Sequence, residues 1–152
     1  MAPQPKKGRF LMRPKVKFLL VDDLADNLLA LSSLLEREDL EVLTASSGSE
    51  ALELLLANDV SLAFFDVQMP EMNGFELAEL VRGSERTRHV PIIFVTAGRD
   101  DQHRLFKGYE AGAVDFLQKP IEPHVLRLEQ IGPLLHSLGA SEWPRSPRKA
   151  GS

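Results

Sequence analysis

The sequence predicts one α/β domain built around a parallel β-sheet. Five apolar runs of strand length alternate along the chain with helix-length segments. The apolar runs are nearly continuous, which is typical of strands that helices cover on both faces. Four of the runs end on polar side chains. In such sheets ligands bind beyond the carboxyl ends of the strands, so we expect the functional site at that edge.

The first predicted strand spans residues 16–21 and ends on Asp22 and Asp23. The next segment has leucines at helical spacing, and we expect them to face the core: Leu24, Leu28, Leu31 and Leu35. The pattern therefore predicts a strand followed at once by a helix.

Residues 41–44 predict a short second strand. Ser47 and Glu50 then form a capping-box pattern, which predicts a helix through about Ala57. Its core-facing residues should be Leu52, Leu55 and Leu56.

The third strand is predicted over residues 62–66, where an apolar run ends abruptly on Asp66. A buried strand does not tolerate an unpaired charge, so Asp66 should face a cleft or a cation. Asn73, with Glu76 three residues later, predicts the start of a third helix that ends near Arg82 before Gly83 and Ser84.

Residues 91–95 predict the fourth strand, which ends on Thr96. Residues 99–110 predict a weak helix because Gly108 interrupts it. The fifth strand is predicted over residues 113–118 and ends on Lys119.

A final helix should begin near Pro123 and be broken at Gly132-Pro133. We expect three parts in the chain: a disordered basic arm (1–15), the folded domain (16–138) and a disordered tail (139–152).

The net charge of −4 is unevenly distributed. Residues 1–17 carry six Lys/Arg and no acid, and residues 139–152 carry three Lys/Arg and one Glu, which leaves −12 on the rest. So negative a charge on residues 18–138 disfavours binding of nucleic acid, because Lys and Arg are needed to neutralise its phosphates. Contact through the basic arm alone is the weaker alternative.

The chain has no cysteine, no apolar run of about 18 residues and no signal-peptide pattern. We therefore expect a cytoplasmic protein without disulfides and without a membrane segment.

The polar strand ends point to phosphoryl transfer. Asp22, Asp23 and Asp66 would repel one another without a cation among them, and oxygen ligands beside a phosphate suit Mg²⁺. Lys119 supplies a positive charge and Thr96 a hydroxyl donor. A carboxylate nucleophile beside a hard cation, a lysine and a hydroxyl can accept a phosphoryl group.

These residues resemble the receiver domains of two-component response regulators, a flavodoxin-like, CheY-like family. The resemblance covers about residues 16–130 and rests on four motifs: Val21-Asp22-Asp23, Asp66 through Gly74, Thr96-Ala97, and Gly112-Ala113 through Lys119-Pro120. It implies a doubly wound (βα)5 fold with strand order 2-1-3-4-5.

By this resemblance Asp66 is the phosphoacceptor, with Thr96 and Lys119 assisting the transfer. Asp22, Asp23, Asp66 and the backbone carbonyl of Gln68 would hold Mg²⁺. Thr96 and Phe116 match the switch pair of the family, and Lys119-Pro120 matches its cis peptide bond.

The resemblance also implies partners. The phosphoryl donor would be a phosphohistidine on a histidine kinase or phosphotransfer protein. A downstream protein would bind the face formed by the fourth helix, fifth strand and last helix. The domain would be a monomer or a weak homodimer, either stand-alone or excised from a hybrid kinase, and not an enzyme in its own right.

Simpler interpretations remain for each residue alone. Asp22 and Asp23 could cap a helix, Asp66 could be a turn residue, and Lys119 could be a solvated lysine. Two other functions also stay open: a constitutive interaction module, and a phosphatase. The phosphatase needs a second acid two residues after the nucleophile, where this chain has Gln68.

Overall fold

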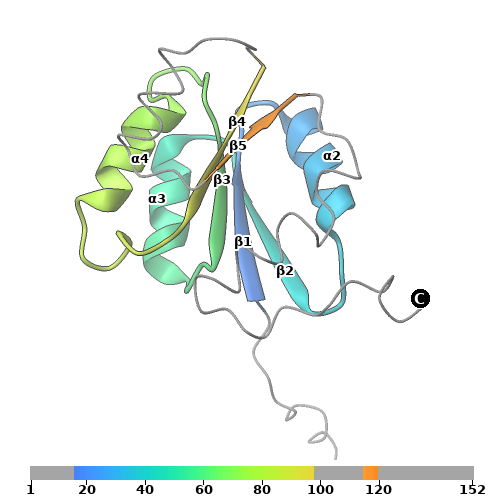
Figure 1. Ribbon diagram of the computed structural model, residues 1–152, viewed down its shortest axis with the longest axis horizontal. Helices are drawn as coiled ribbons and strands as arrows, with labels where there is room; N and C mark the ends of the chain where they lie inside the picture. Colours follow the sequence, from blue (N-terminus) through green and yellow to red (C-terminus); the bar gives the residue numbers. More distant parts are fainter. Residues whose placement is uncertain (1–15, 98–114, 120–152) are drawn as a thin grey trace, which may run out of the picture.

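A five-stranded parallel sheet forms the centre of the computed structural model, which describes residues 16–97 and 115–119 (Figure 1). The strand order across the sheet is β2-β1-β3-β4-β5, so the predicted fold class and the order 2-1-3-4-5 are confirmed. The strands are β1 (Val16–Val21), β2 (Leu40–Ala45), β3 (Leu62–Asp66), β4 (Ile92–Thr96) and β5 (Asp115–Gln118).

Helices cover both faces of the sheet. In Figure 1, α2 lies on one side, and α3 and α4 lie together on the other. Their bounds are α2 (Ala25–Leu35), α3 (Gly48–Ala57) and α4 (Gly74–Arg82). This doubly wound arrangement explains why the strands are apolar on both faces: all five residues of β3 are buried.

The observed strand bounds differ slightly from the prediction. β2 is one residue longer at each end. β4 begins at Ile92 and not at Pro91, because proline has no N–H for the ladder. The carbonyl of Pro91 still accepts a hydrogen bond from Ala63 N at 3.0 Å.

The core has two halves because successive strand residues point to opposite faces. One half lies between the sheet and α3 and α4, and its strand residues include Leu19, Val21, Ala63, Phe65, Ile92 and Phe94. The other lies on the α2 face, and its strand residues include Phe18, Leu20, Leu62, Phe64, Ile93 and Val95.

Of the three described helices, α2 has the fewest buried residues. Leu35 is the buried residue of α2, whereas Leu28 and Leu31 are only partly buried against the core. The prediction that Leu24 faces the core is wrong: it is the N-cap residue and its side chain is 57% exposed. A cavity of about 410 Å³ lies between α2 and strands β1, β3 and β4.

The predicted start of α3 is confirmed with one change. Ser47 accepts a hydrogen bond from Glu50 N at 3.2 Å, as a capping box requires, but the Glu50 carboxylate accepts from Ser46 N at 2.8 Å and not from Ser47 N. Leu55 is buried, but Leu56 is 49% exposed, so its predicted core position is wrong. It follows Leu55 by one residue, a turn of about 100° away from the core.

The cap of α4 is complete. Asn73 Oδ1 accepts from Glu76 N at 2.8 Å, and Glu76 Oε1 accepts from Asn73 N at 2.9 Å. The helix ends at Arg82 and Gly83 N donates back into its last turn, as predicted. Five residues of this helix are buried: Gly74, Phe75, Leu77, Ala78 and Val81.

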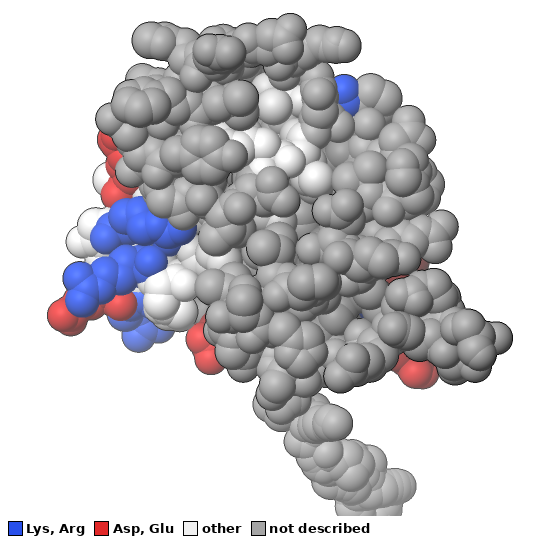
Figure 2. Space-filling model, in the orientation of Figure 1, with Lys and Arg blue, Asp and Glu red and all other residues white. Residues whose placement is uncertain are grey.

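Among the described residues visible in Figure 2, most of the basic side chains lie on the side of α4. Arg82 and Arg86 lie in or just after α4, at the edge of the sheet opposite the strand carboxyl ends, and both donate to backbone carbonyls. Arg82 reaches Val90 O at 2.7 Å and Arg86 reaches Leu56 O at 2.6 Å. These hydrogen bonds hold the loop between α4 and β4 in place.

Several predictions fall outside the described residues: the basic arm 1–15, the weak helix 99–110, the Pro120 peptide bond, the helix from Pro123 and the tail 139–152. In the part that is described, no helix has the length and apolar character needed to cross a bilayer.

Candidate functional site

The carboxyl ends of the strands are tied to one another by hydrogen bonds just beyond the ladder. Asp22 N donates to Ala45 O at 3.1 Å, Val67 N to Val95 O at 3.0 Å, and Lys119 N to Thr96 O at 2.9 Å. The residue that follows each of β1, β3 and β5 is therefore positioned by its neighbouring strand. The polar strand ends meet at one edge of the sheet, as the sequence predicts.

Three carboxylates converge at this edge. Asp22, Asp23 and Asp66 each offer an oxygen, and these oxygens lie within 4.8 Å of one another. Asp22 and Asp66 are buried, at 7% and 5% exposure, and Asp23 is partly exposed. Burial of paired carboxylates is unfavourable unless positive charge is close.

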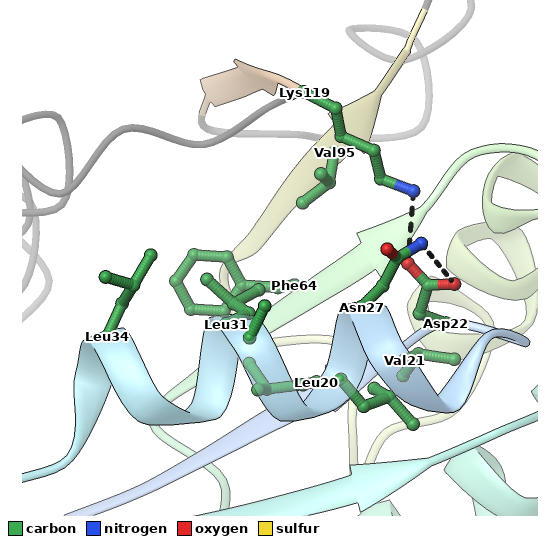
Figure 3. A pocket seen from close by; sticks show the side chains of 11 residues that line it. Leu20, Val21, Asp22, Asn27, Leu31, Leu34, Phe64, Val95 and Lys119 are labelled. Carbon is green, nitrogen blue, oxygen red and sulfur yellow. Dashed lines mark hydrogen bonds and ion pairs between the residues drawn. The ribbon is translucent and has the colours of Figure 1, made fainter.

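Lys119 supplies that positive charge from the end of β5. Its Nζ lies 3.1 Å from Asp22 Oδ2 and 2.9 Å from Asp66 Oδ1, so one ammonium bridges two buried acids. Figure 3 shows Lys119 extending across the cavity rim towards Asp22. The interpretation of Lys119 as a solvated surface lysine is therefore wrong.

The environment shifts two pKa values. Burial raises the pKa of Asp66 above its ordinary value; the hydrogen bond from Lys119 opposes this, and the charges of Asp22 and Asp23 add to it. For Lys119, burial alone lowers the pKa, but hydrogen bonds to Asp66 and Asp22 and their charges outweigh it and raise the pKa. Lys119 therefore stays charged, and Asp66 is the acid whose ionisation the site opposes.

Asp22 is held by the start of α2 as well. Its Oδ1 accepts from Leu24 N at 2.9 Å and from Asn27 Nδ2 at 3.4 Å. The sequence interpretation missed Asn27. The signal was present: a helix with leucine at its N-cap lacks a side-chain cap of its own, and a polar residue in its first turn can reach back.

The loop after Asp66 is shaped by a tight backbone turn. Met72 N donates to Pro70 O at 2.7 Å across Glu71, whose φ is +70°, so these residues form a strained γ-turn. Gly74 N donates to Val67 O at 3.0 Å, and a Cβ at Gly74 would collide with the Asp66 carbonyl. Only glycine fits there, because the loop returns directly against the strand that carries Asp66.

Thr96 and Phe116 belong to the other face of the sheet. Thr96 follows Phe94 by two residues, so strand alternation places both on the α3–α4 face. Phe116 is partly buried against the same core half, with its ring centroid 5.5 Å from that of Phe94. The two predicted switch residues therefore share one face, and Thr96 ends β4 at the same edge of the sheet where Asp66 ends β3.

The donor set fits a hard divalent cation. Oxygen ligands without His or Cys are typical of Mg²⁺ sites. Three carboxylates with one ammonium have a formal charge of −2, which one divalent ion would offset. Gln68 is exposed and lies in the loop two residues after Asp66, and its backbone carbonyl stays a predicted ligand.

Comparison with known proteins agrees with this geometry. The model of the family described as response regulator receiver domain matches residues 18–129. The chain therefore belongs to the response regulator receiver domain family, the receiver module of two-component signalling.

The chain is 38% identical over 112 residues to the response regulator PleD of Caulobacter vibrioides, covering 72% of this chain and 24% of PleD. It is 37% identical over 117 residues to the transcriptional regulatory protein SrrA of Staphylococcus aureus, covering 76% of this chain and 47% of SrrA. It thus spans from about a quarter to about a half of the length of these relatives.

A solved CheY-like receiver domain from Methanospirillum hungatei superposes with a TM-score of 0.74 at 29% identity. The match covers 84% of this chain and 98% of that one. Nearly the whole of that receiver is thus represented in this chain.

Proposed function

We propose that this protein is a phosphorylation-switched receiver that accepts a phosphoryl group on Asp66 in a Mg²⁺-dependent reaction. The observation that supports this most directly is the Lys119 bridge. A buried Asp66 beside two further carboxylates and one ammonium is unfavourable as a purely structural arrangement, but suits a nucleophile that needs charge compensation.

In the proposed transfer, an Asp66 carboxylate oxygen attacks the phosphorus of a phosphohistidine. The new P–O bond gives an acyl phosphate, and the P–N bond breaks with its electron pair returning to the imidazole nitrogen. The donor would be a histidine kinase or a histidine phosphotransfer protein.

Each residue of the site has a role in this proposal. Lys119, already 2.9 Å from Asp66, would pair with an oxygen of the incoming phosphoryl group. Asp22, Asp23, Asp66 and the Gln68 carbonyl would hold Mg²⁺. The bound ion would neutralise charge on the phosphoryl oxygens.

The switch would run through the sheet to its other face. The Thr96 hydroxyl would hydrogen-bond the phosphoryl group, and Phe116 would turn inward against the α3–α4 core that it already contacts. Because Phe116 is in β5, the change would reach the face that we predict for the helix at 99–110, β5 and the helix from Pro123, where a downstream protein would bind. We infer a cytoplasmic location and a monomer or weak homodimer.

The test is the intact mass of the protein after incubation with acetyl phosphate, with and without Mg²⁺. We expect a Mg²⁺-dependent gain of about 80 Da, the mass of one phosphoryl group, that is absent in Asp66→Asn. Asp59→Asn is a matched control, since Asp59 is an exposed aspartate just before β3, and it should label like the parent. Labelling that persists in Asp66→Asn would contradict the assignment.

A further inference from the structure

The buried carboxylate of Asp22 is held from three directions. Lys119 Nζ contacts Oδ2 at 3.1 Å, while Leu24 N and Asn27 Nδ2 both donate to Oδ1, at 2.9 and 3.4 Å. Figure 3 shows Asn27 and Lys119 approaching Asp22 together. The two oxygens of Asp22 therefore have different partners: Oδ1 faces the start of α2, and Oδ2 faces Lys119.

We propose that Asn27 is a positioning residue of the cation site, holding Oδ1 of Asp22 so that Oδ2 is the oxygen offered to the metal ion and to Lys119. This inference rests on the proposed Mg²⁺-dependent function. Partners of this kind, which bind a ligand residue and not the ion, fix the orientation of the ligand and tune affinity.

The position of Asn27 suits this role. Its backbone is fixed in the first turn of α2, where Asn27 N donates to Leu24 O at 3.1 Å. The Cα from which the side-chain amide extends towards Asp22 is therefore fixed in position. Its side chain lines the cavity of about 410 Å³ at the polar end, whereas Leu28, Leu31 and Phe64 line the apolar part. Asn27 thus lies at the polar end of this cavity together with Asp22 and Lys119, which also line it.

A neutral donor is the residue type that this position needs. An amide N–H stabilises the Asp22 carboxylate without adding charge to a site that already has three acids. Leucine has a similar branched shape but is larger and offers no donor, and it would extend the apolar lining up to Asp22.

The experiment is calorimetric titration of Mg²⁺ into the full chain, without phosphodonor, alongside thermal unfolding in EDTA. For Asn27→Leu we expect the Mg²⁺ dissociation constant to rise about 3- to 10-fold. That is below the usual ~10- to 100-fold loss for such partners, because Leu24 N still holds Oδ1. Asn27→Gln, which keeps the donor, should restore affinity to within about 2-fold of the parent.

Two further variants separate positioning from packing. Asn27→Ala removes the donor without adding apolar volume and should weaken Mg²⁺ binding like Asn27→Leu; it also replaces the leucine variant if that does not fold. Ser33→Leu places leucine at an exposed site of the same helix and should bind Mg²⁺ like the parent.

The outcomes are distinct. If Asn27→Leu and Asn27→Ala bind Mg²⁺ as tightly as the parent, or if Asn27→Gln loses as much affinity as they do, the positioning role is wrong while the proposed function stands. A lower unfolding temperature in EDTA with unchanged Mg²⁺ affinity would likewise reduce Asn27 to a structural residue. A parent chain that binds no Mg²⁺ would overturn both proposals.

Discussion

The two faces of the sheet are built differently. On one face, α4 has a complete capping box and buries five residues, and its core half contains the contacting rings of Phe65, Phe75 and Phe94. On the other face, α2 begins on Leu24 without a side-chain cap and buries only Leu35, beside a cavity of about 410 Å³.

Among the described residues, the α3–α4 face is stabilised by its own contacts, whereas α2 depends on contacts with the candidate site. The α3–α4 face is anchored by its own caps and aromatic packing. The start of α2 is anchored by Asp22, an acid of the site, through Leu24 N and Asn27. The helix that supports the site is thus held partly by the site itself, and changes there should affect α2 more than α4.

The largest expected effect tests the packing difference directly. Phe94→Ala should lower the free energy of unfolding by about 3–5 kcal/mol, since Phe94 is fully buried and contacts three other rings. Leu28→Ala on the α2 face should cost only about 1 kcal/mol, because Leu28 is partly exposed. Urea unfolding measures both.

Phe94→Leu, expected to cost about 1–2 kcal/mol, keeps the test measurable if the alanine variant does not fold. Equal costs for the Phe94 and Leu28 truncations would show that the two faces are equally well packed, and the comparison would fail.

A second test concerns the helix starts. Asn73→Ala should cost about 1 kcal/mol, because it removes the cap of α4. Leu24→Ser should instead stabilise the protein by about 0.5 kcal/mol, since it gives the exposed N-cap of α2 a side-chain acceptor. Thermal unfolding of both variants in one buffer gives the comparison, and a destabilising Leu24→Ser would mean that α2 does not lack a cap.

The smallest effect is the pH dependence due to Asp66. Its pKa is raised in the folded state by burial, so the folded protein binds its proton more tightly than the unfolded chain. The resulting stability is fully present below about pH 4 and is lost as the pH rises through the folded-state pKa.

Measured in EDTA, the parent should therefore lose stability relative to Asp66→Asn as the pH increases above about 4. Unfolding temperatures from pH 3 to 8 give the curve. A difference between the two proteins that stays flat across this range would contradict the raised pKa.

The sequence predicted the sheet and the strand ends well because both depend on simple patterns. An apolar run of strand length that ends on Asp66 indicates a buried strand, and parallel strands bring their carboxyl ends to one edge of the sheet. Asn73 and Glu76 predicted α4 correctly because a capping box is a local motif.

The face of α2 was harder to predict because its leucines lie all around the helix. Leu29 and Leu34 are exposed while Leu28 and Leu31 are partly buried, so spacing alone did not exclude Leu24 from the core. Contacts that depend on the direction of a side chain, such as that of Asn27 with Asp22, are even harder to predict from the sequence pattern. The positive φ of Glu71 follows from the way the loop closes, and glutamate itself has no preference for it.

The alternation of the strands also has a consequence for insertions and deletions. Asp22 follows Leu20, Asp66 follows Phe64 and Lys119 follows Leu117, each by two residues, and these three apolar residues all belong to the α2-face core half. Removing or adding one residue within β3 would turn Asp66 towards the opposite face, away from Lys119. The site is therefore encoded in residue counts as much as in residue types, and a change of strand length would be more damaging than most substitutions.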